Sequence, residues 1–151
     1  MKMKHRFEIK ESVVSILSSF RQVTGNERGG VLTGSIISDD TYRVSNVSEP
    51  CLFLNASDRC SYIRDASKAN KFIKEDFEKS EHTRVYSGEW HTHPEDEPTP
   101  SSVDLNSIKE IYQKSELVID GVVLVIVGLK SNYYGFYNGV RIKRITVEIV
   151  Q

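Results

Sequence analysis

Two histidines separated by one residue, and followed by an aspartate, are the residues of this chain best suited to chemistry. His91 and His93 lie in the sequence HTHP, residues 91–94, and Asp104 ends the sequence PSSVD, residues 100–104. Imidazole nitrogens and carboxylate oxygens are common ligands of zinc in proteins. The pattern therefore predicts a metal site of the kind found in zinc hydrolases.

The residues that lead up to the histidines have the composition of a β-strand. Segment 84–93 is rich in β-branched and aromatic residues and shows no helical periodicity. Side chains two positions apart on a strand share a face at a spacing of about 6–7 Å, so His91 and His93 can reach one ion. Turn-forming residues follow the strand and should end it, and the acidic residues 95–97 among them are expected to be solvated.

A helix is expected after this loop, because Ser101 or Ser102 can act as an N-cap. Its apolar stripe would consist of Val103, Leu105, Ile108, Ile111 and Tyr112. Asp104 would lie in the first turn, where the helix dipole and free N–H groups stabilise a carboxylate that can fold back onto the histidines. Three protein ligands leave one tetrahedral position of zinc open, which is typical of catalytic sites.

Hydrolysis also needs a group that accepts and donates a proton. Glu27 precedes a glycine-rich segment, residues 29–34, that predicts a strand and close backbone approach. Glu89 has the same strand parity as the two histidines, so it can face the metal or lie beside it. Spacing alone leaves both glutamates open as the acid/base.

Together, these segments resemble the JAMM (MPN-type) metalloprotease family. Residues 27–34 (ERGGVLTG), 91–94 and 100–104 match the order and spacing of the family motif: a glutamate before a small-residue strand, then His-x-His, seven residues, Ser, two residues and Asp. The compact length and the sequence YSGEW, residues 86–90, are similar to small bacterial members. These members include the deconjugating proteases of anti-phage CBASS operons.

The resemblance implies a role for each matched residue. Glu27 would be the acid/base, and Glu89 becomes a secondary candidate. Ser101 would hydrogen-bond the carbonyl oxygen as negative charge develops on it. By the same carry-over, the ligands of the zinc ion would be His91, His93 and Asp104.

The resemblance also implies a substrate, namely the peptide or isopeptide bond after the C-terminal tail of a ubiquitin-like protein. A protein conjugated in the same manner, such as a cyclase conjugate, would also be a substrate. An extended tail can add as a strand to a sheet edge, and narrow walls beside the metal would select glycine. Family members that act on ubiquitin often hold it with inserted segments, and residues 55–64 are the comparable segment here.

Two other functions fit the same motifs. One is a non-catalytic MPN-like scaffold that binds a ubiquitin-like fold, although the examples of that class lose motif residues that this chain retains. The other is a zinc hydrolase that acts on a small molecule or on a sulfur-carrier fusion. The motifs of helical zinc proteases (His-Glu-x-x-His) and of nucleobase deaminases are absent from the sequence.

Length favours a single domain over residues 1–151, and the resemblance implies that this domain is MPN-like. A chain of 151 residues can bury about 68–70% of its unfolded surface. The net charge of −1 gives no basic footprint for nucleic acid. Charged residues interrupt any signal-peptide core near the amino terminus, and the apolar run 122–127 is far below the ~20 residues of a membrane span. We therefore expect a soluble cytoplasmic protein without nucleic-acid or membrane partners.

The two cysteines are expected to be free thiols. Cys51 and Cys60 are separated by eight residues and do not form a Cys-x-x-Cys pair. Reducing compartments disfavour a disulfide between them.

Periodicity predicts a mixed central β-sheet flanked by helices, of the α/β or α+β class depending on strand direction. Helices are expected over residues 11–21 and 64–79, in addition to the one after Ser101. Strands are expected over residues 31–37, 42–47, 121–129, 133–137 and 142–150, in addition to 84–93.

Overall fold

The computed structural model describes residues 5–59 and 61–151, so the prediction of a free Cys60 thiol falls outside it. The strands are β1 (Arg6–Lys10), β2 (Gly29–Ser38), β3 (Thr41–Val47), β4 (Val85–Thr92), β5 (Val122–Val127), β6 (Asn132–Tyr137), β7 (Ile142–Arg144) and β8 (Val147–Val150). The helices are α1 (Glu11–Ser19), α2 (Ala66–Lys79) and α3 (Ser102–Lys114), with one turn of 3₁₀ helix at Leu54–Ala56. In this described part of the chain, none of the helices has the length and apolar character needed to cross a membrane.

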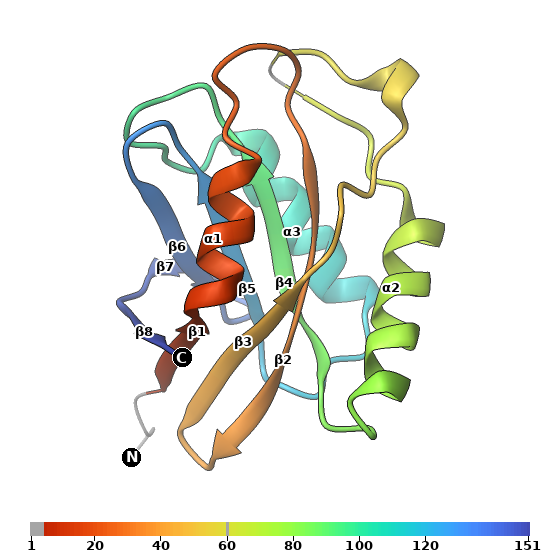
Figure 1. The fold of residues 1–151 in the computed structure, drawn as a ribbon, viewed down its shortest axis with the longest axis vertical. Helices are drawn as coiled ribbons and strands as arrows, with labels where there is room; N and C mark the ends of the chain where they lie inside the picture. Colours follow the sequence, from red (N-terminus) through yellow and green to blue (C-terminus); the bar gives the residue numbers. More distant parts are fainter. Residues whose placement is uncertain (1–4, 60) are drawn as a thin grey trace.

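Within these residues, the strands form one mixed sheet in the order β7-β6-β5-β4-β2-β3-β1-β8. β4 is central, since it pairs parallel with β5 and antiparallel with β2. α1 covers one face of the sheet, and α2 and α3 lie on the other (Figure 1). A mixed sheet flanked by helices is the architecture that the sequence predicted.

The alternation of side chains along the strands divides the core between the two faces. Leu17 of α1 belongs to the same buried cluster as Trp90 of β4. Ile108 of α3 packs with Leu124 of β5 on the opposite face. All residues of β5 are buried, as expected for a central strand that is covered on both sides.

The alternation of side chains along β4 decides which face of the sheet carries the histidines. Trp90 is fully buried, and Phe20 stacks on it with ring centroids 4.8 Å apart. Its chain neighbours Glu89 and His91 point to the other face, where they line a cavity together with Ile108. The candidate chemistry therefore lies on the side of α2 and α3.

Two parts of the sheet differ from the sequence-based prediction. β1, which was not expected, pairs parallel with both β3 and β8. Residues 142–150, expected as one strand, form β7 and β8 at opposite edges of the sheet. Local periodicity could not show either feature, because the pairing is decided by strands that are distant in the sequence.

α3 buries fewer residues than its periodicity suggested. Ile108 is 2% exposed, whereas Val103 and Leu105 are 64% and 38% exposed. The first turn of the helix therefore projects beyond the core, beside the predicted metal ligands.

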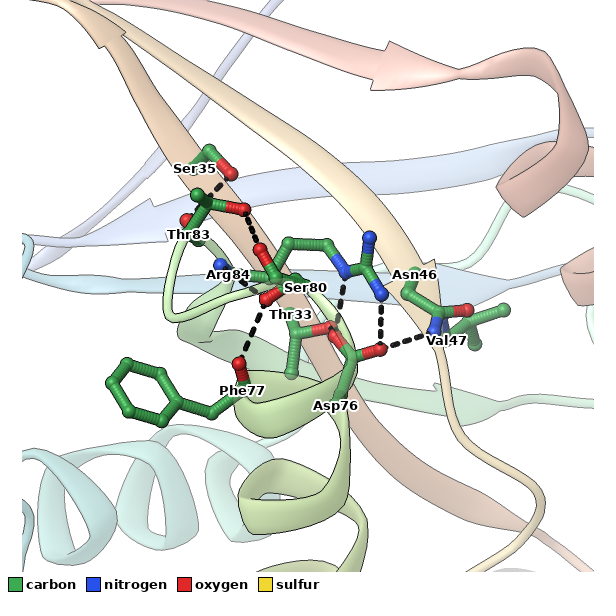
Figure 2. Close-up of polar contacts among 9 residues, drawn as sticks. All are labelled: Thr33, Ser35, Asn46, Val47, Asp76, Phe77, Ser80, Thr83 and Arg84. Atoms are coloured by element: carbon green, nitrogen blue, oxygen red, sulfur yellow. Dashed lines mark hydrogen bonds and ion pairs between the residues drawn. The ribbon is translucent and has the colours of Figure 1, made fainter.

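A buried carboxylate near the C-terminal end of α2 ties this helix to the sheet (Figure 2). Asp76 accepts hydrogen bonds from Thr33 Oγ1 (2.6 Å), Asn46 Nδ2 (2.8 Å), Arg84 Nε (2.8 Å) and Arg84 Nη2 (2.7 Å). Burial opposes its ionisation, but these donors outweigh burial and hold the pKa of Asp76 below its usual value. The cluster joins α2 to β2, β3 and the residue before β4.

Candidate metal centre and active site

Four side chains that the sequence singled out meet just beyond the end of β4. One possible ligand atom each from Glu27, His91, His93 and Asp104 lies within 4.8 Å of the others. His91 Nε2 is 3.1 Å from Asp104 Oδ1, and His93 Nε2 is 3.2 Å from Asp104 Oδ2. Ligand atoms at 2.0–2.1 Å from a tetrahedral zinc ion are about 3.3 Å apart. Each histidine nitrogen therefore lies at ligand spacing from one oxygen of the Asp104 carboxylate.

Asp104 reaches the histidines because α3 begins beside them. Ser101 is the N-cap of α3, and its Oγ accepts a hydrogen bond from the Asp104 N–H at 3.1 Å. The Ser101 N–H donates in return to Asp104 Oδ2 at 2.8 Å, which completes a capping box. Burial opposes the ionisation of Asp104, but the adjacent imidazoles of His91 and His93 outweigh it and hold its pKa far below the usual range.

A buried nitrogen in this cluster supports the binding of a metal. His91 Nε2 is buried, and among the residues that the structure describes it makes no hydrogen bond, although Asp104 Oδ1 lies 3.1 Å away. Such an atom costs free energy unless a ligand supplies the missing interaction. Two imidazole nitrogens and a carboxylate are a donor set that suits zinc.

Glu95 orients the ring of His93 from the side away from the cluster. Its Oε1 lies 2.9 Å from His93 Nδ1. A carboxylate at Nδ1 fixes the ring proton there and leaves Nε2 free to bind a metal. Residues 95–97 are exposed, as expected, but Glu95 also contacts a predicted metal ligand. The only sequence signal for this contact was the position of Glu95 two residues after His93. The loop conformation decides which acidic side chain lies against the histidine ring.

Glu27 is a buried carboxyl group in the irregular segment before β2, and 5% of it is exposed. Burial is the main cause that raises its pKa from the usual 4.5 to about 8; His93 opposes this rise, whereas Asp104 and Asp58 add to it. Within the described part of the chain, no side-chain hydrogen bond reaches this carboxyl group. A free carboxyl group with a pKa near neutrality can both accept and donate a proton.

Glu89 has a different environment from Glu27. Arg64 Nε donates to Glu89 Oε1 at 2.7 Å, and Arg64 Nη2 donates to Oε2 at 3.2 Å. The Tyr86 hydroxyl also donates to Oε2. Burial raises the pKa of Glu89 while Arg64 opposes that rise. Because both oxygens are engaged, the geometry favours Glu27 over Glu89 as the acid/base.

A cavity of about 70 Å³ opens beside the cluster, and a groove of about 620 Å³ between α2 and α3 shares Ser107 and Ile111 with it. Tyr62, from segment 55–64, lines the cavity and packs on Gly29, where a Cβ would collide with the tyrosine hydroxyl. Ser61 and Tyr62, from the segment compared above with substrate-holding insertions, therefore lie next to the candidate active site.

Comparisons with known proteins agree with the fold and the motifs. A family model described as prokaryotic homologs of the JAB domain matches residues 10–139. A solution structure of a Desulfitobacterium hafniense protein is similar in fold, with a TM-score of 0.67 and 20% identity over 96% of this chain and 93% of the other. The fold and the motifs thus define a JAB-type domain, the class to which the JAMM resemblance pointed.

Two curated proteins extend the comparison. A Vibrio cholerae serotype O1 protein named CD-NTase/cGAS isopeptidase is 35% identical over 125 residues, which are 82% of this chain and 76% of that protein. An Escherichia coli protein of the same name is 32% identical over 129 residues, 84% of this chain and 79% of that protein. The chain belongs to the prokaryotic JAB family, which confirms the family resemblance and the single mixed-sheet domain.

Proposed function

We propose that this protein is a zinc-dependent isopeptidase that hydrolyses the bond after the C-terminal tail of a ubiquitin-like protein or of a protein conjugated in that manner. The observation that carries the proposal is the convergence of Glu27 with His91, His93 and Asp104. The names of the two curated relatives make a cyclase conjugate the leading substrate. Anti-phage defence in the cytoplasm is the setting that we propose from the family resemblance. We take residues 1–151 as one catalytic domain.

In this proposal, His91, His93 and Asp104 hold the zinc ion. Zinc bound there supplies a Lewis acid that polarises the scissile carbonyl and makes water more acidic. Glu27 accepts the proton of the attacking water and passes it to the leaving amine. A pKa of about 8 before any cation binds is compatible with both steps, since a nearby positive charge lowers it towards neutrality.

Ser101 contributes a hydroxyl group to the carbonyl oxygen. Its oxygen already accepts the N-cap hydrogen bond from Asp104. A serine hydroxyl can accept and donate at the same time, so its hydrogen remains available to the substrate. Donation to an oxygen that becomes negative in the transition state stabilises that state more than the ground state. Glu89 remains the secondary candidate for proton transfer.

The test is cleavage of a panel of fusions that carry different ubiquitin-like C-terminal tails, followed by mass spectrometry. Zinc-loaded wild type is compared with a chelated sample, with Glu27→Ala and with Glu97→Ala, which changes an exposed glutamate of the nearby loop. We expect cleavage that requires zinc and Glu27 but not Glu97. Normal cleavage by Glu27→Ala would contradict the acid/base assignment. No cleavage by protein with one zinc ion bound would favour a binding scaffold or a hydrolase of a small molecule or sulfur-carrier fusion instead.

A further inference from the structure

Gln22 is a buried polar residue that no catalytic motif includes. Only 1% of it is exposed, although it lies in the irregular segment between α1 and β2. Glu27 belongs to the same segment, so its position depends on contacts that hold this segment against the sheet. Gln22 makes several of these contacts.

The side-chain amide of Gln22 joins three parts of the chain. Its Nε2 donates to the carbonyl oxygens of Gly25 (3.1 Å) and Arg59 (2.8 Å). Its Oε1 accepts a hydrogen bond from Thr92 Oγ1 at 3.0 Å. Both amide hydrogens are used, and the two carbonyl partners leave only one orientation of the amide possible.

Thr92 carries this network to the strand of the two histidines. It lies between them in the sequence, is fully buried, and points its side chain to the opposite face of β4. Thr92 Oγ1 accepts from the Arg28 N–H at 3.1 Å, and the Thr92 N–H donates to the Arg28 carbonyl at 2.9 Å. A continuous chain of hydrogen bonds thus runs from the residue after Glu27, through Thr92, to Gln22.

We propose that Gln22 is a positioning residue that holds Glu27 in place over His91 and His93 by joining the Glu27 segment to β4. The proposal rests on the proposed function, because the position of Glu27 affects turnover only if Glu27 transfers the proton. A displacement of a catalytic group by about 1 Å can reduce a rate by about 10²-fold.

Gln22→Met tests this role, because methionine has a similar length and fills the site without hydrogen bonds. We expect kcat to fall by about 10–100-fold while KM stays within about threefold and zinc remains bound at one ion per chain. Gln113→Met makes the same change on the exposed surface of α3 and should leave kcat within about twofold. An unchanged kcat in Gln22→Met would overturn the proposal.

A double-mutant cycle separates positioning from general structural support. If Gln22 acts through Glu27, Gln22→Met should change the residual rate of Glu27→Ala by less than about twofold. If Gln22→Met lowered the rate by the same factor in wild type and in Glu27→Ala, Gln22 would act independently of Glu27 and the proposal would fail.

Thr92 offers a second route should Gln22→Met fold poorly. Thr92→Val removes the hydroxyl and should lower kcat as Gln22→Met does, whereas Thr92→Ser retains the hydroxyl and should keep kcat within about threefold of wild type. Equal kcat values in the two Thr92 variants would contradict the proposed role of the hydrogen-bond chain through Thr92.

Hydrogen exchange tests this chain of hydrogen bonds without any substrate. The Arg28 amide should exchange at least about 10-fold faster in Gln22→Met and in Thr92→Val, while amides of β5 stay unchanged. If wild type cleaves no fusion, the proposed function fails, yet this measurement still decides whether Gln22 holds the Glu27 segment. Unchanged exchange at Arg28 would overturn the positional role.

Discussion

Two buried clusters of charged and polar groups on the same side of the sheet use similar side chains in opposite ways. Near the C-terminal end of α2, four donor atoms surround the Asp76 carboxylate. Beyond the end of β4, Glu27 and the two histidines lie around Asp104 with fewer internal hydrogen bonds. The first cluster is closed, and the second leaves polar atoms for a ligand.

The difference shows how burial can serve stability in one place and chemistry in another. At Asp76, the donors outweigh burial and lower the pKa. At Glu27, burial dominates and raises the pKa to about 8. An unsatisfied buried polar group typically costs about 1–3 kcal/mol. Such a cost is tolerated where binding of a substrate or metal offsets it.

The largest expected effect is the loss of activity when the open cluster loses a ligand. His93→Ala should reduce cleavage by at least about 10³-fold and abolish stoichiometric zinc binding, because only two of the three proposed ligands remain. Zinc content by mass spectrometry and single-turnover rates check this. His82→Ala, at an exposed histidine that pairs with Glu78, is the matched control. Full zinc occupancy in His93→Ala would remove His93 from the ligand set.

The closed cluster should respond in stability instead of activity. Asp76→Ala leaves Arg84 without its carboxylate partner and should lower the free energy of unfolding by about 3–5 kcal/mol. Urea denaturation measures this, with Asp39→Ala in the exposed β2–β3 turn as control. The rate per folded molecule at low temperature should remain within about twofold of wild type. A large loss of that rate would show that the two clusters are coupled.

The pKa of Glu27 predicts how metal-free stability depends on pH. The folded pKa of about 8 lies above the usual 4.5, so ionising Glu27 lowers the free energy of unfolding. This loss of stability is absent below pH 4.5 and grows as the pH rises towards 8. Glu27→Gln stays neutral, so it should become more stable than wild type by a few kcal/mol between about pH 5 and about pH 9. Chelated samples in urea at several pH values provide the measurement. If the difference in unfolding free energy between Glu27→Gln and wild type did not change with pH, the raised pKa of Glu27 would be contradicted.

The smallest expected effect concerns the carboxylate that orients His93. Glu95→Gln should weaken zinc binding by about 10–100-fold, since the amide orients the ring less strongly and makes it less basic. Competition with a chelating dye measures the affinity. Glu97→Gln changes an exposed residue of the same loop and should have no effect. Equal affinities in both variants would show that the contact of Glu95 with His93 does not affect zinc binding.

Much of the candidate site could be predicted because its signals are local. The alternation of a strand places His91 and His93 on one face, and the N-cap pattern places Asp104 in the first turn of α3. Helix and strand periodicity likewise predicted α1, α2 and most strands, with ends shifted by a few residues. The division of residues 142–150 between two sheet edges was missed, because it depends on partners far along the chain.

The sequence by itself determined the types of residue at the site, their spacing and the family of the fold. Only the tertiary structure decided that Arg64 engages Glu89, that Glu95 orients His93, and that Gln22 reaches Thr92. These contacts join segments on different elements or depend on how a loop turns, so no local period encodes them. Hydrogen bonds and burial depend on distance in space, and folding alone brings these groups within reach.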